Sequence, residues 1–135
     1  MVRLLFFLLI LLVGCVKSDP PPNPFRAPIS YPLEKSPSHV VAIDLNQDRL
    51  LDLVIANTED RSISIFQNKE GRFQPPIRLP VGKQPRSISW GDFNGDNKPD
   101  LVVLNNDENN FYLLLNKGGG RWEAPLIQET GRIPF

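Results

Sequence analysis

The chain has 135 residues, and its 15 Lys and Arg are balanced by 15 Asp and Glu, so the formal net charge at pH 7 is zero. A neutral chain of this length has room for one domain and offers no basic field that would attract nucleic acid. The single cysteine excludes an internal disulfide framework and a thiolate zinc site, and the single histidine leaves few side chains for catalysis. We therefore expect a binding or structural protein rather than an enzyme, and no nucleic-acid partner.

Residues 1–14 are typical of an export signal. Arg3 precedes an apolar run over residues 4–13, about half of the roughly 20 residues that cross a bilayer as a helix. The run ends in Leu12-Val13-Gly14-Cys15, which resembles the bacterial lipoprotein signal. The resemblance implies removal of the signal peptide 1–14 and a lipid on Cys15 that anchors the protein in a membrane, at the outer membrane or cell surface of a bacterium. The alternative is an ordinary secretory signal with an unmodified cysteine.

A proline-rich segment follows Cys15. Prolines recur at short intervals, among them Pro20, Pro24, Pro28 and Pro32, and this spacing favours an extended polyproline II conformation over a packed core. We expect residues 15–36 to be a lipidated cysteine and a linker that hold the following domain away from the membrane.

Two tandem repeats follow the linker. A shift of the sequence by 48 positions brings identical residues together in eleven pairs. They are Lys35/Lys83, Pro37/Pro85, Asp44/Asp92, Asn46/Asn94, Asp48/Asp96, Asp52/Asp100, Leu53/Leu101, Val54/Val102, Asn57/Asn105, Asn68/Asn116 and Lys69/Lys117. One residue is then inserted in the turn at residues 118–120, and the shift becomes 49. We assign repeat 1 to residues 37–84, repeat 2 to residues 85–132, and the start of a third repeat to residues 133–135.

Each repeat contains four short patterns that predict β-strands. They cover residues 40–44, 53–57, 62–66 and 76–79 in the first repeat, and residues 87–91, 101–104, 111–115 and 126–128 in the second. In the first repeat, Pro76 at the start of the fourth pattern predicts a proline-tolerant outer strand. Four strands in about 48 residues are typical of a β-propeller blade. The predicted fold is therefore all-β, with two four-stranded β-propeller-type blades that form an incomplete propeller after the signal peptide and the proline-rich tether.

The turn between the first and second strands is acidic in both repeats. It reads Asp44-Leu-Asn-Gln-Asp-Arg-Leu-Leu-Asp52 in the first and Asp92-Phe-Asn-Gly-Asp-Asn-Lys-Pro-Asp100 in the second. Side-chain oxygens at positions 1, 3, 5 and 9, with a backbone oxygen at position 7, are the ligands that Ca²⁺ prefers. The candidate metal ligands are Asp92, Asn94, Asp96, Asp100 and the backbone oxygen of Lys98, and Asp44, Asn46, Asp48, Asp52 and the backbone oxygen of Leu50.

These turns have two alternative interpretations. Asn, Asp and Gly favour solvated turns without any metal, although three carboxylates held close together repel one another in the absence of a counter-ion. An EF-hand loop has a similar beginning, but it requires a bidentate Glu at position 12, where this chain has Ile55 and Val103. Both residues lie within predicted strands, so the EF-hand interpretation is disfavoured.

The second turn and the strand after it, residues 92–103, resemble the FG-GAP/VCBS repeat, which builds the seven-bladed propeller of integrin α-subunits and occurs in many bacterial surface proteins. The resemblance extends over about 100 residues, 35–135. It implies a blade with Ca²⁺ in the loop between its first two strands, and a protein that binds or scaffolds. The first repeat departs from the pattern, because Gln47 replaces the usual Gly and Arg49 stands beside the carboxylates.

The number of repeats raises a further expectation. A closed propeller typically has four to eight blades, whereas two repeats provide two. We expect either a shortened piece of a longer propeller lipoprotein or a two-blade unit that completes itself by self-association. The expected function is that of a calcium-binding surface module with a protein or carbohydrate ligand. The alternatives are a non-functional remnant of a longer propeller and an accessory piece of an extracellular enzyme.

Overall fold

A computed structural model describes residues 29–131 of the chain. The chain divides into two units, the first ending at Tyr31 and the second beginning at Pro32. The described part of the first unit, residues 29–31, contains no helix or strand. The predicted signal peptide, Cys15 and the predicted start of a third repeat lie outside the described residues. Within residues 29–131, no helix has the length and apolar character needed to cross a membrane.

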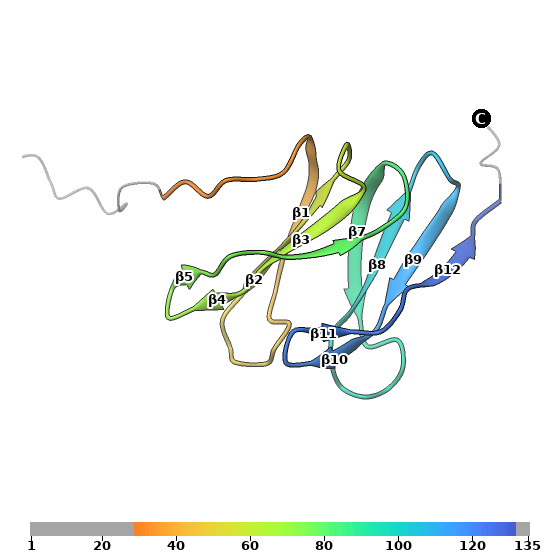
Figure 1. Cartoon of the computed structure of the whole chain (residues 1–135). Helices are drawn as coiled ribbons and strands as arrows, with labels where there is room; N and C mark the ends of the chain where they lie inside the picture. The colour runs from red at the N-terminus through yellow and green to blue at the C-terminus, as the bar shows by residue number, and fades with distance from the viewer. Residues whose placement is uncertain (1–28, 132–135) are drawn as a thin grey trace, which may run out of the picture. The chain divides into compact units, whose positions relative to one another are not determined.

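Each repeat folds into a four-stranded antiparallel sheet within the second unit (Figure 1). Sheet 1 has the order β1-β2-β3-β6 and contains β1 (Pro37–Ile43), β2 (Asp52–Asn57), β3 (Ser62–Phe66) and β6 (Ile77–Pro80). Sheet 2 has the order β7-β8-β9-β12 and contains β7 (Pro85–Gly91), β8 (Asp100–Asn105), β9 (Asn110–Leu114) and β12 (Leu126–Glu129). The prediction of an all-β fold with two four-stranded blade-type sheets is confirmed.

The positions of the strands follow from their side chains. The second and third strands of each repeat are rich in β-branched and aliphatic residues and lie in the middle of the sheets. The fourth strand of sheet 1, β6, ends at Pro80 and lies at the sheet edge, where a missing backbone N–H leaves no gap in the ladder. The predicted outer strand at residues 76–79 is therefore confirmed.

Strand registers agree between the two sheets pair by pair. Val41 lies opposite Val54 in sheet 1, and Ser89 lies opposite Val102 in sheet 2, 48 positions further along the chain. The first strand of each sheet also carries a register shift at the same place, between Pro37 and His39 and between Pro85 and Ser87. The two repeats are thus equivalent in backbone geometry as well as in sequence.

Two short hairpins, absent from the strand prediction, follow the third strand of each sheet. They are β4 (Asn68–Lys69) with β5 (Arg72–Phe73), and β10 (Asn116–Gly118) with β11 (Arg121–Trp122). The residue inserted in the second repeat is accommodated by a register shift between Asn116 and Gly118. Strands of two or three residues carry too few side chains for an alternating pattern, so periodicity does not detect them.

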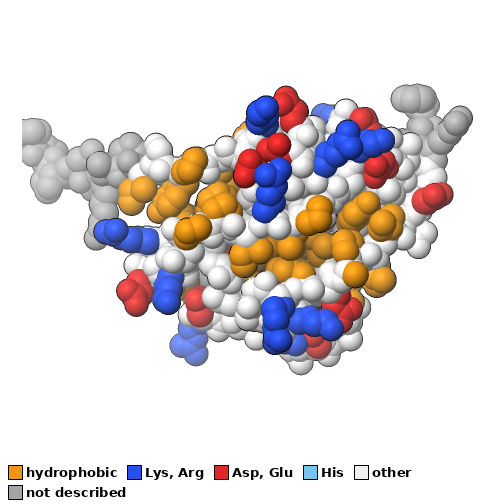
Figure 2. All heavy atoms as spheres, viewed as in Figure 1, with side chains coloured by type: hydrophobic (Ala, Val, Ile, Leu, Met, Phe, Trp, Pro, Cys, Tyr) orange, Lys and Arg blue, Asp and Glu red, His pale blue; other side chains and the backbone are white. Residues whose placement is uncertain are grey.

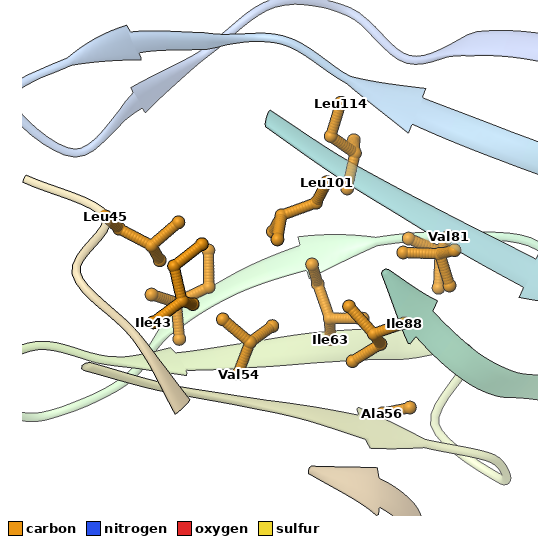
Figure 3. Packing of buried hydrophobic residues seen from close by; sticks show 11 residues of the cluster. Ile43, Leu45, Val54, Ala56, Ile63, Val81, Ile88, Leu101 and Leu114 are labelled. Carbon is orange, nitrogen blue, oxygen red and sulfur yellow. The ribbon is translucent and has the colours of Figure 1, made fainter. Parts of the chain in front are cut away.

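The hydrophobic core lies between the facing sides of the two sheets (Figure 3). It contains Ile43, Leu45, Val54, Ala56, Ile63, Ile65, Val81, Ile88, Leu101, Val103 and Leu114. Val54 and Ala56 reach this core from one face of β2, and Leu101 and Val103 reach it from one face of β8. Ile55, on the opposite face of β2, is also buried. Figure 2 shows a band of hydrophobic side chains that crosses the viewed face over β6 and toward β9. One continuous core therefore holds the two blades together.

Candidate functional site

Both acidic loops lie at the same end of the two sheets (Figure 1). The first loop, residues 44–52, connects β1 to β2, and the second loop, residues 92–100, connects β7 to β8. The antiparallel pairing places these two connections in equivalent positions. The structure therefore places the predicted metal ligands of each repeat in one loop.

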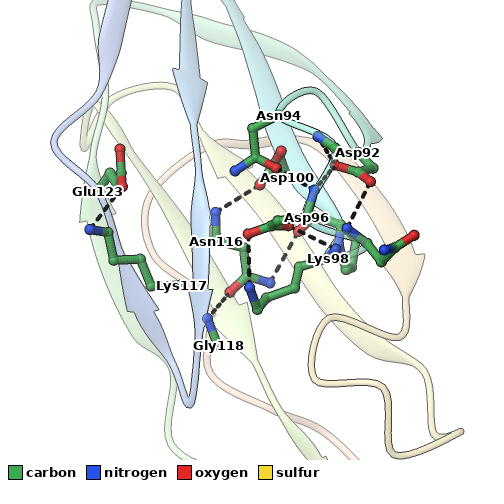
Figure 4. Close-up of polar contacts among 12 residues, drawn as sticks. Asp92, Asn94, Asp96, Lys98, Asp100, Asn116, Lys117, Gly118 and Glu123 are labelled. Atoms are coloured by element: carbon green, nitrogen blue, oxygen red, sulfur yellow. Dashed lines mark hydrogen bonds and ion pairs between the residues drawn. The ribbon is translucent and has the colours of Figure 1, made fainter.

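The second loop is folded around the side chain of Asp92 (Figure 4). Its Oδ1 accepts hydrogen bonds from the backbone N–H groups of Gly95 at 2.7 Å and Asp96 at 3.1 Å, and its Oδ2 accepts one from Asn97 at 2.8 Å. Asn94 Oδ1 also accepts from the Asp96 N–H, at 3.0 Å. Asp96 Oδ1 accepts from the N–H of Lys98 at 2.9 Å. The side chains predicted to bind metal thus stabilise the turn by accepting hydrogen bonds from its backbone N–H groups.

The first loop repeats this pattern of hydrogen bonds. Asp44 Oδ1 accepts from the N–H of Asp48 at 3.0 Å, and Asp44 Oδ2 accepts from the N–H of Arg49 at 2.8 Å. Asn46 Oδ1 accepts from the Asp48 N–H at 3.0 Å, and Asp48 Oδ1 accepts from the N–H of Leu50 at 2.8 Å. The sequence match between the loops therefore corresponds to a match in geometry.

Asp52 and Asp100, the last candidate ligand of each loop, are fully buried. Asp100 Oδ2 accepts a hydrogen bond from the Phe93 N–H at 3.0 Å, and Asp100 Oδ1 accepts one from the Asn116 N–H at 2.8 Å. Asp52 makes the equivalent bonds to the N–H groups of Leu45 and Asn68, at 3.2 and 2.7 Å. Each carboxylate thus ties its loop to the start of the following short hairpin. Burial raises the pKa of Asp52, and the two backbone hydrogen bonds oppose that shift.

The two loops differ in how they neutralise their charge. Lys98 Nζ lies 2.8 Å from Asp96 Oδ2, and this hydrogen-bonded ion pair lowers the pKa of Asp96. In the first loop the same position is Leu50, and Asp48 Oδ2 instead accepts a hydrogen bond from Asn46 Nδ2 at 2.9 Å. The second loop therefore contains an ammonium group that competes with any cation for Asp96.

Left-handed backbone conformations occur at the same two positions of each loop. Gly95 has φ 79° and Asn97 has φ 63°, as expected for residue types that tolerate this region. In the first loop the equivalent residues are Gln47, with φ 62°, and Arg49, with φ 71°. Neither side chain suits a left-handed conformation, so the first loop is more strained than the second. This supports the sequence-based distinction between the two loops.

The loops also contact each other. Gln47 Nε2 donates a hydrogen bond to the backbone oxygen of Asn97. Between the loops lies a cavity of about 410 Å³, whose lining includes Asp44, Asp92, Leu51 and Trp90. The end of the molecule that carries the acidic loops is therefore one connected surface formed by both repeats.

No ready-made metal cage is present in the described part of the chain. Among residues 29–131, no group of three or more His, Cys, Asp or Glu side chains is arranged to hold a metal ion. The candidate carboxylates of each loop share a short segment, but most of their oxygen atoms face backbone N–H groups. The donor chemistry of the loops fits a hard cation such as Ca²⁺, and their present hydrogen bonds serve the turn itself.

Two residues that connect the repeats were missed in the sequence analysis. Asn116 Nδ2 donates to the backbone oxygen of Leu45 at 3.0 Å and to that of Pro99 at 3.1 Å, so it touches both loops. His39 Nδ1 accepts a hydrogen bond from the Ile88 N–H at 3.2 Å and joins β1 to β7. The sequence signal for Asn116 was that an Asn, Asn68, stands at the equivalent position of the first repeat. No local sequence pattern indicates the role of His39.

Comparison with known proteins agrees with this geometry. Residues 44–103 match the FG-GAP-like repeat family, a segment that begins with the first acidic loop and ends within β8. The chain therefore carries an FG-GAP-like repeat over these residues. No curated protein and no solved structure matches the chain.

Proposed function

We propose that this FG-GAP repeat protein is a calcium-binding, membrane-anchored lipoprotein whose blades act as a binding or scaffold module at the outer membrane or cell surface of a bacterium. The observation that carries the proposal is the presence of two acidic loops with the same hydrogen-bond pattern at the same end of two equivalent sheets. Such agreement over nine positions is more than a solvated turn requires. The FG-GAP-like match over residues 44–103 gives the proposal independent support.

The residues that would hold the ion are those of the two loops. In the second loop they are Asp92, Asn94, Asp96, Asp100 and the backbone oxygen of Lys98, and in the first they are Asp44, Asn46, Asp48, Asp52 and the backbone oxygen of Leu50. When bound, Ca²⁺ would supply positive charge that offsets the repulsion among three carboxylates. The chain's own part is to hold those carboxylates in one turn and to release Asp96 from the ammonium group of Lys98.

Calcium binding is tested by thermal unfolding of the full chain in mild detergent, in Ca²⁺ and in chelator, with Mg²⁺ as the control for ionic strength. A ligand that binds only the folded state stabilises it by about 2.7 kcal/mol when its concentration is a hundred times Kd. We expect a higher melting temperature in Ca²⁺. Asp96→Ala should abolish most of that rise, and the matched variant Asp48→Ala should remove less of it. Equal melting temperatures in Ca²⁺ and chelator would show that the loops are turns without a metal.

Membrane anchoring is proposed to depend on Cys15, the only cysteine in the chain. Several acyl chains would hold the protein firmly, because each buried CH₂ contributes about 0.8 kcal/mol. The test is fractionation of a bacterial host that expresses the full chain or Cys15→Ala, together with labelling by a radioactive fatty acid. We expect Cys15→Ala to lose the label and to leave the membrane fraction. Membrane association that is unchanged and still needs detergent for release would refute the anchor.

The proposed ligand is a protein or a carbohydrate, bound rather than chemically changed. The full chain in detergent can be applied to arrays of bacterial surface polysaccharides and of secreted proteins, in Ca²⁺ and in chelator. We expect retention by one class of ligand with no new product in solution. Hydrolysis of a polysaccharide or ester by the purified chain would instead support the accessory-enzyme alternative.

A further inference from the structure

Trp90 is a large aromatic side chain that stays in water at the margin of the core. It lies two residues after Ile88 in β7, so both side chains are on the face of sheet 2 that packs on sheet 1. Ile88 is 3% exposed, whereas Trp90, at the end of β7 that leads into the second loop, is 56% exposed. The equivalent residue of repeat 1 is Ala42. Because repeat 1 folds with alanine at this position, the blade itself does not require the indole ring.

The indole ring of Trp90 borders the cavity of about 410 Å³ that lies between the two acidic loops. Pockets that bind small ligands in proteins typically have volumes of about 300–1,000 Å³. The lining of this cavity combines two exposed apolar side chains, Trp90 and Leu51, with the polar side chains of Asp44, Asp92 and Gln47. Such a lining suits a ligand that has an apolar face and also several groups that form hydrogen bonds.

The two walls of the cavity are held in place relative to each other. Asn116 Nδ2 donates to Leu45 O of the first loop at 3.0 Å and to Pro99 O of the second loop at 3.1 Å. Gln47 Nε2 adds a direct hydrogen bond from the first loop to Asn97 O of the second. A site whose walls are already ordered loses little conformational entropy when a ligand binds. The cavity is therefore preorganised by contacts between the two repeats.

The charges around the cavity favour a neutral ligand. The carboxylates of Asp44 and Asp92 line it and would repel an anion. An indole ring beside carboxylates also suits a cation, but Lys98 already brings an ammonium group to this lining, where Nζ lies 2.8 Å from Asp96 Oδ2. A saccharide ring has an apolar C–H face that packs on an aromatic ring, and its hydroxyl groups donate to carboxylate and amide oxygens. A neutral saccharide therefore matches both the apolar and the polar parts of the lining.

We propose that the cavity between the two acidic loops binds a neutral saccharide. One face of the sugar ring lies against the indole of Trp90, and its hydroxyl groups donate to the carboxylates of Asp44 and Asp92 and to the amide oxygen of Gln47. The inference rests on the binding role proposed above, for which it names the class of ligand and the place where the ligand binds. It depends neither on bound calcium nor on a lipid at Cys15.

The first test is isothermal titration of the full chain, in a mild detergent without a sugar headgroup, with glucose, galactose, mannose, N-acetylglucosamine and their disaccharides, in Ca²⁺ and in chelator. Trp90→Ala and Phe93→Ala form a matched pair, because the two aromatic residues are 56% and 52% exposed and only Trp90 lines the cavity. We expect at least one of these saccharides to bind, Trp90→Ala to weaken its binding at least tenfold, and Phe93→Ala to leave it unchanged. Equal effects of the two variants, or no binding of any saccharide, would overturn the proposal.

The second test removes a polar group from the cavity without straining the backbone. Gln47 has φ 62°, and the equivalent residue of repeat 2 is Gly95, with φ 79°. Gln47→Gly therefore deletes the amide and suits the left-handed conformation. We expect a melting temperature no lower than that of the unchanged chain and a severalfold weaker binding of the saccharide. An unchanged affinity would contradict the assigned polar contact.

The third test places the saccharide and separates this inference from the proposed function. Trp122→Phe leaves Trp90 as the single tryptophan, and phenylalanine is the residue of repeat 1 at the equivalent position, Phe73. A saccharide that packs on the indole should shift the emission of Trp90 to shorter wavelength, whereas unchanged emission at saturation would overturn this site. A protein or a cationic peptide that binds in place of every saccharide would support the binding module and overturn the saccharide site. Retention of no ligand of any class would contradict the proposed function itself.

Discussion

Asn116 Nδ2 donates a hydrogen bond to the backbone oxygen of Leu45 at 3.0 Å, across a separation of 71 residues. Leu45 belongs to the first acidic loop, and the same amide group also reaches Pro99 O in the second loop. Leu45 directly follows the candidate metal ligand Asp44, and Pro99 directly precedes the candidate metal ligand Asp100. One buried side chain of the second repeat therefore fixes the spacing of the two loops.

The first prediction concerns this bridge. Asn116→Ala should lower the free energy of unfolding by about 2 kcal/mol, because two backbone oxygens lose their donor and Asn116 is buried. Asn68→Ala at the equivalent position should cost less, about 0.5 kcal/mol, since Asn68 Nδ2 reaches only Leu51 O near the surface. Urea unfolding of both variants gives the comparison. Similar losses at the two sites would contradict the bridging role of Asn116.

The buried carboxylates are predicted to be structural even without metal. Asp100→Asn keeps the size of the side chain but replaces one acceptor of a backbone hydrogen bond by a donor. We expect the free energy of unfolding to fall by about 3 kcal/mol in chelator. Asp107→Asn, at an exposed position, is the control and should change little. Urea unfolding in chelator separates this role from calcium binding, and an unchanged midpoint for Asp100→Asn would disprove it.

Backbone strain in the first loop predicts a substitution that raises the free energy of unfolding rather than lowering it. Arg49→Gly should stabilise the chain by about 1 kcal/mol, because glycine adopts the left-handed conformation of φ 71° without steric cost and keeps the N–H that Asp44 accepts. Asn97→Gly should have a smaller effect, since Asn already tolerates this conformation. Thermal unfolding in chelator provides the measurement. A loss of stability in Arg49→Gly equal to that of an ordinary glycine substitution would contradict the argument.

The ion pair of Lys98 with Asp96 predicts a dependence on pH. It lowers the pKa of Asp96 below the usual 3.8, so its contribution to stability is present above that pH and is lost as the pH falls through the lowered pKa. Lys98→Met should therefore flatten the loss of stability below pH 3.8. Asp60, whose pKa is lowered mainly by the Lys35 N–H, should still contribute its part of that loss. Melting temperatures over this pH range in chelator provide the test, and an unchanged profile would refute it.

Lys98→Met is also predicted to bind Ca²⁺ more strongly than the unchanged chain. In the unchanged chain, Ca²⁺ would have to displace the Lys98 ammonium group from Asp96. Without that ammonium group, binding of Ca²⁺ would break no ion pair. Lys98→Met should increase the calcium affinity severalfold in isothermal titration. Lys117→Met is the matched control, since Lys117 pairs with Glu123 at 2.8 Å outside the loop. An affinity that falls in Lys98→Met would show that the lysine does not compete for the site.

Much of the fold was open to prediction because its signals are local. Ser62–Phe66 alternates apolar and polar residues over a whole strand, and the strand prediction there matches β3 in both bounds. The first and second loops are punctuated by residues that favour turns, and Gly95 and Asn97 have the left-handed conformation expected of them. The two short hairpins escaped prediction because strands of two or three residues have no measurable period.

The roles of the acidic residues were only partly open to prediction. A spacing of alternate oxygens indicated a common turn, and Asp92 and Asp44 do organise their loops. That Asp52 and Asp100 are buried and accept hydrogen bonds from distant backbone groups depends on which strand lies beneath each loop. Such a contact joins residues that are far apart in the sequence, and no local pattern records it.

By itself, the sequence determined the two repeats, the strand pattern, and the position and composition of both acidic loops, because periodicity and turn preference act over a few neighbouring residues. Only the tertiary structure decided which face of each sheet is buried. Val54 and Val102 are equivalent in the sequence, yet Val54 is completely buried in the core between the sheets and Val102 is partly exposed on the face of sheet 2 that does not contact sheet 1. Burial depends on what packs against a strand from the rest of the chain, and identical residues therefore meet different surroundings.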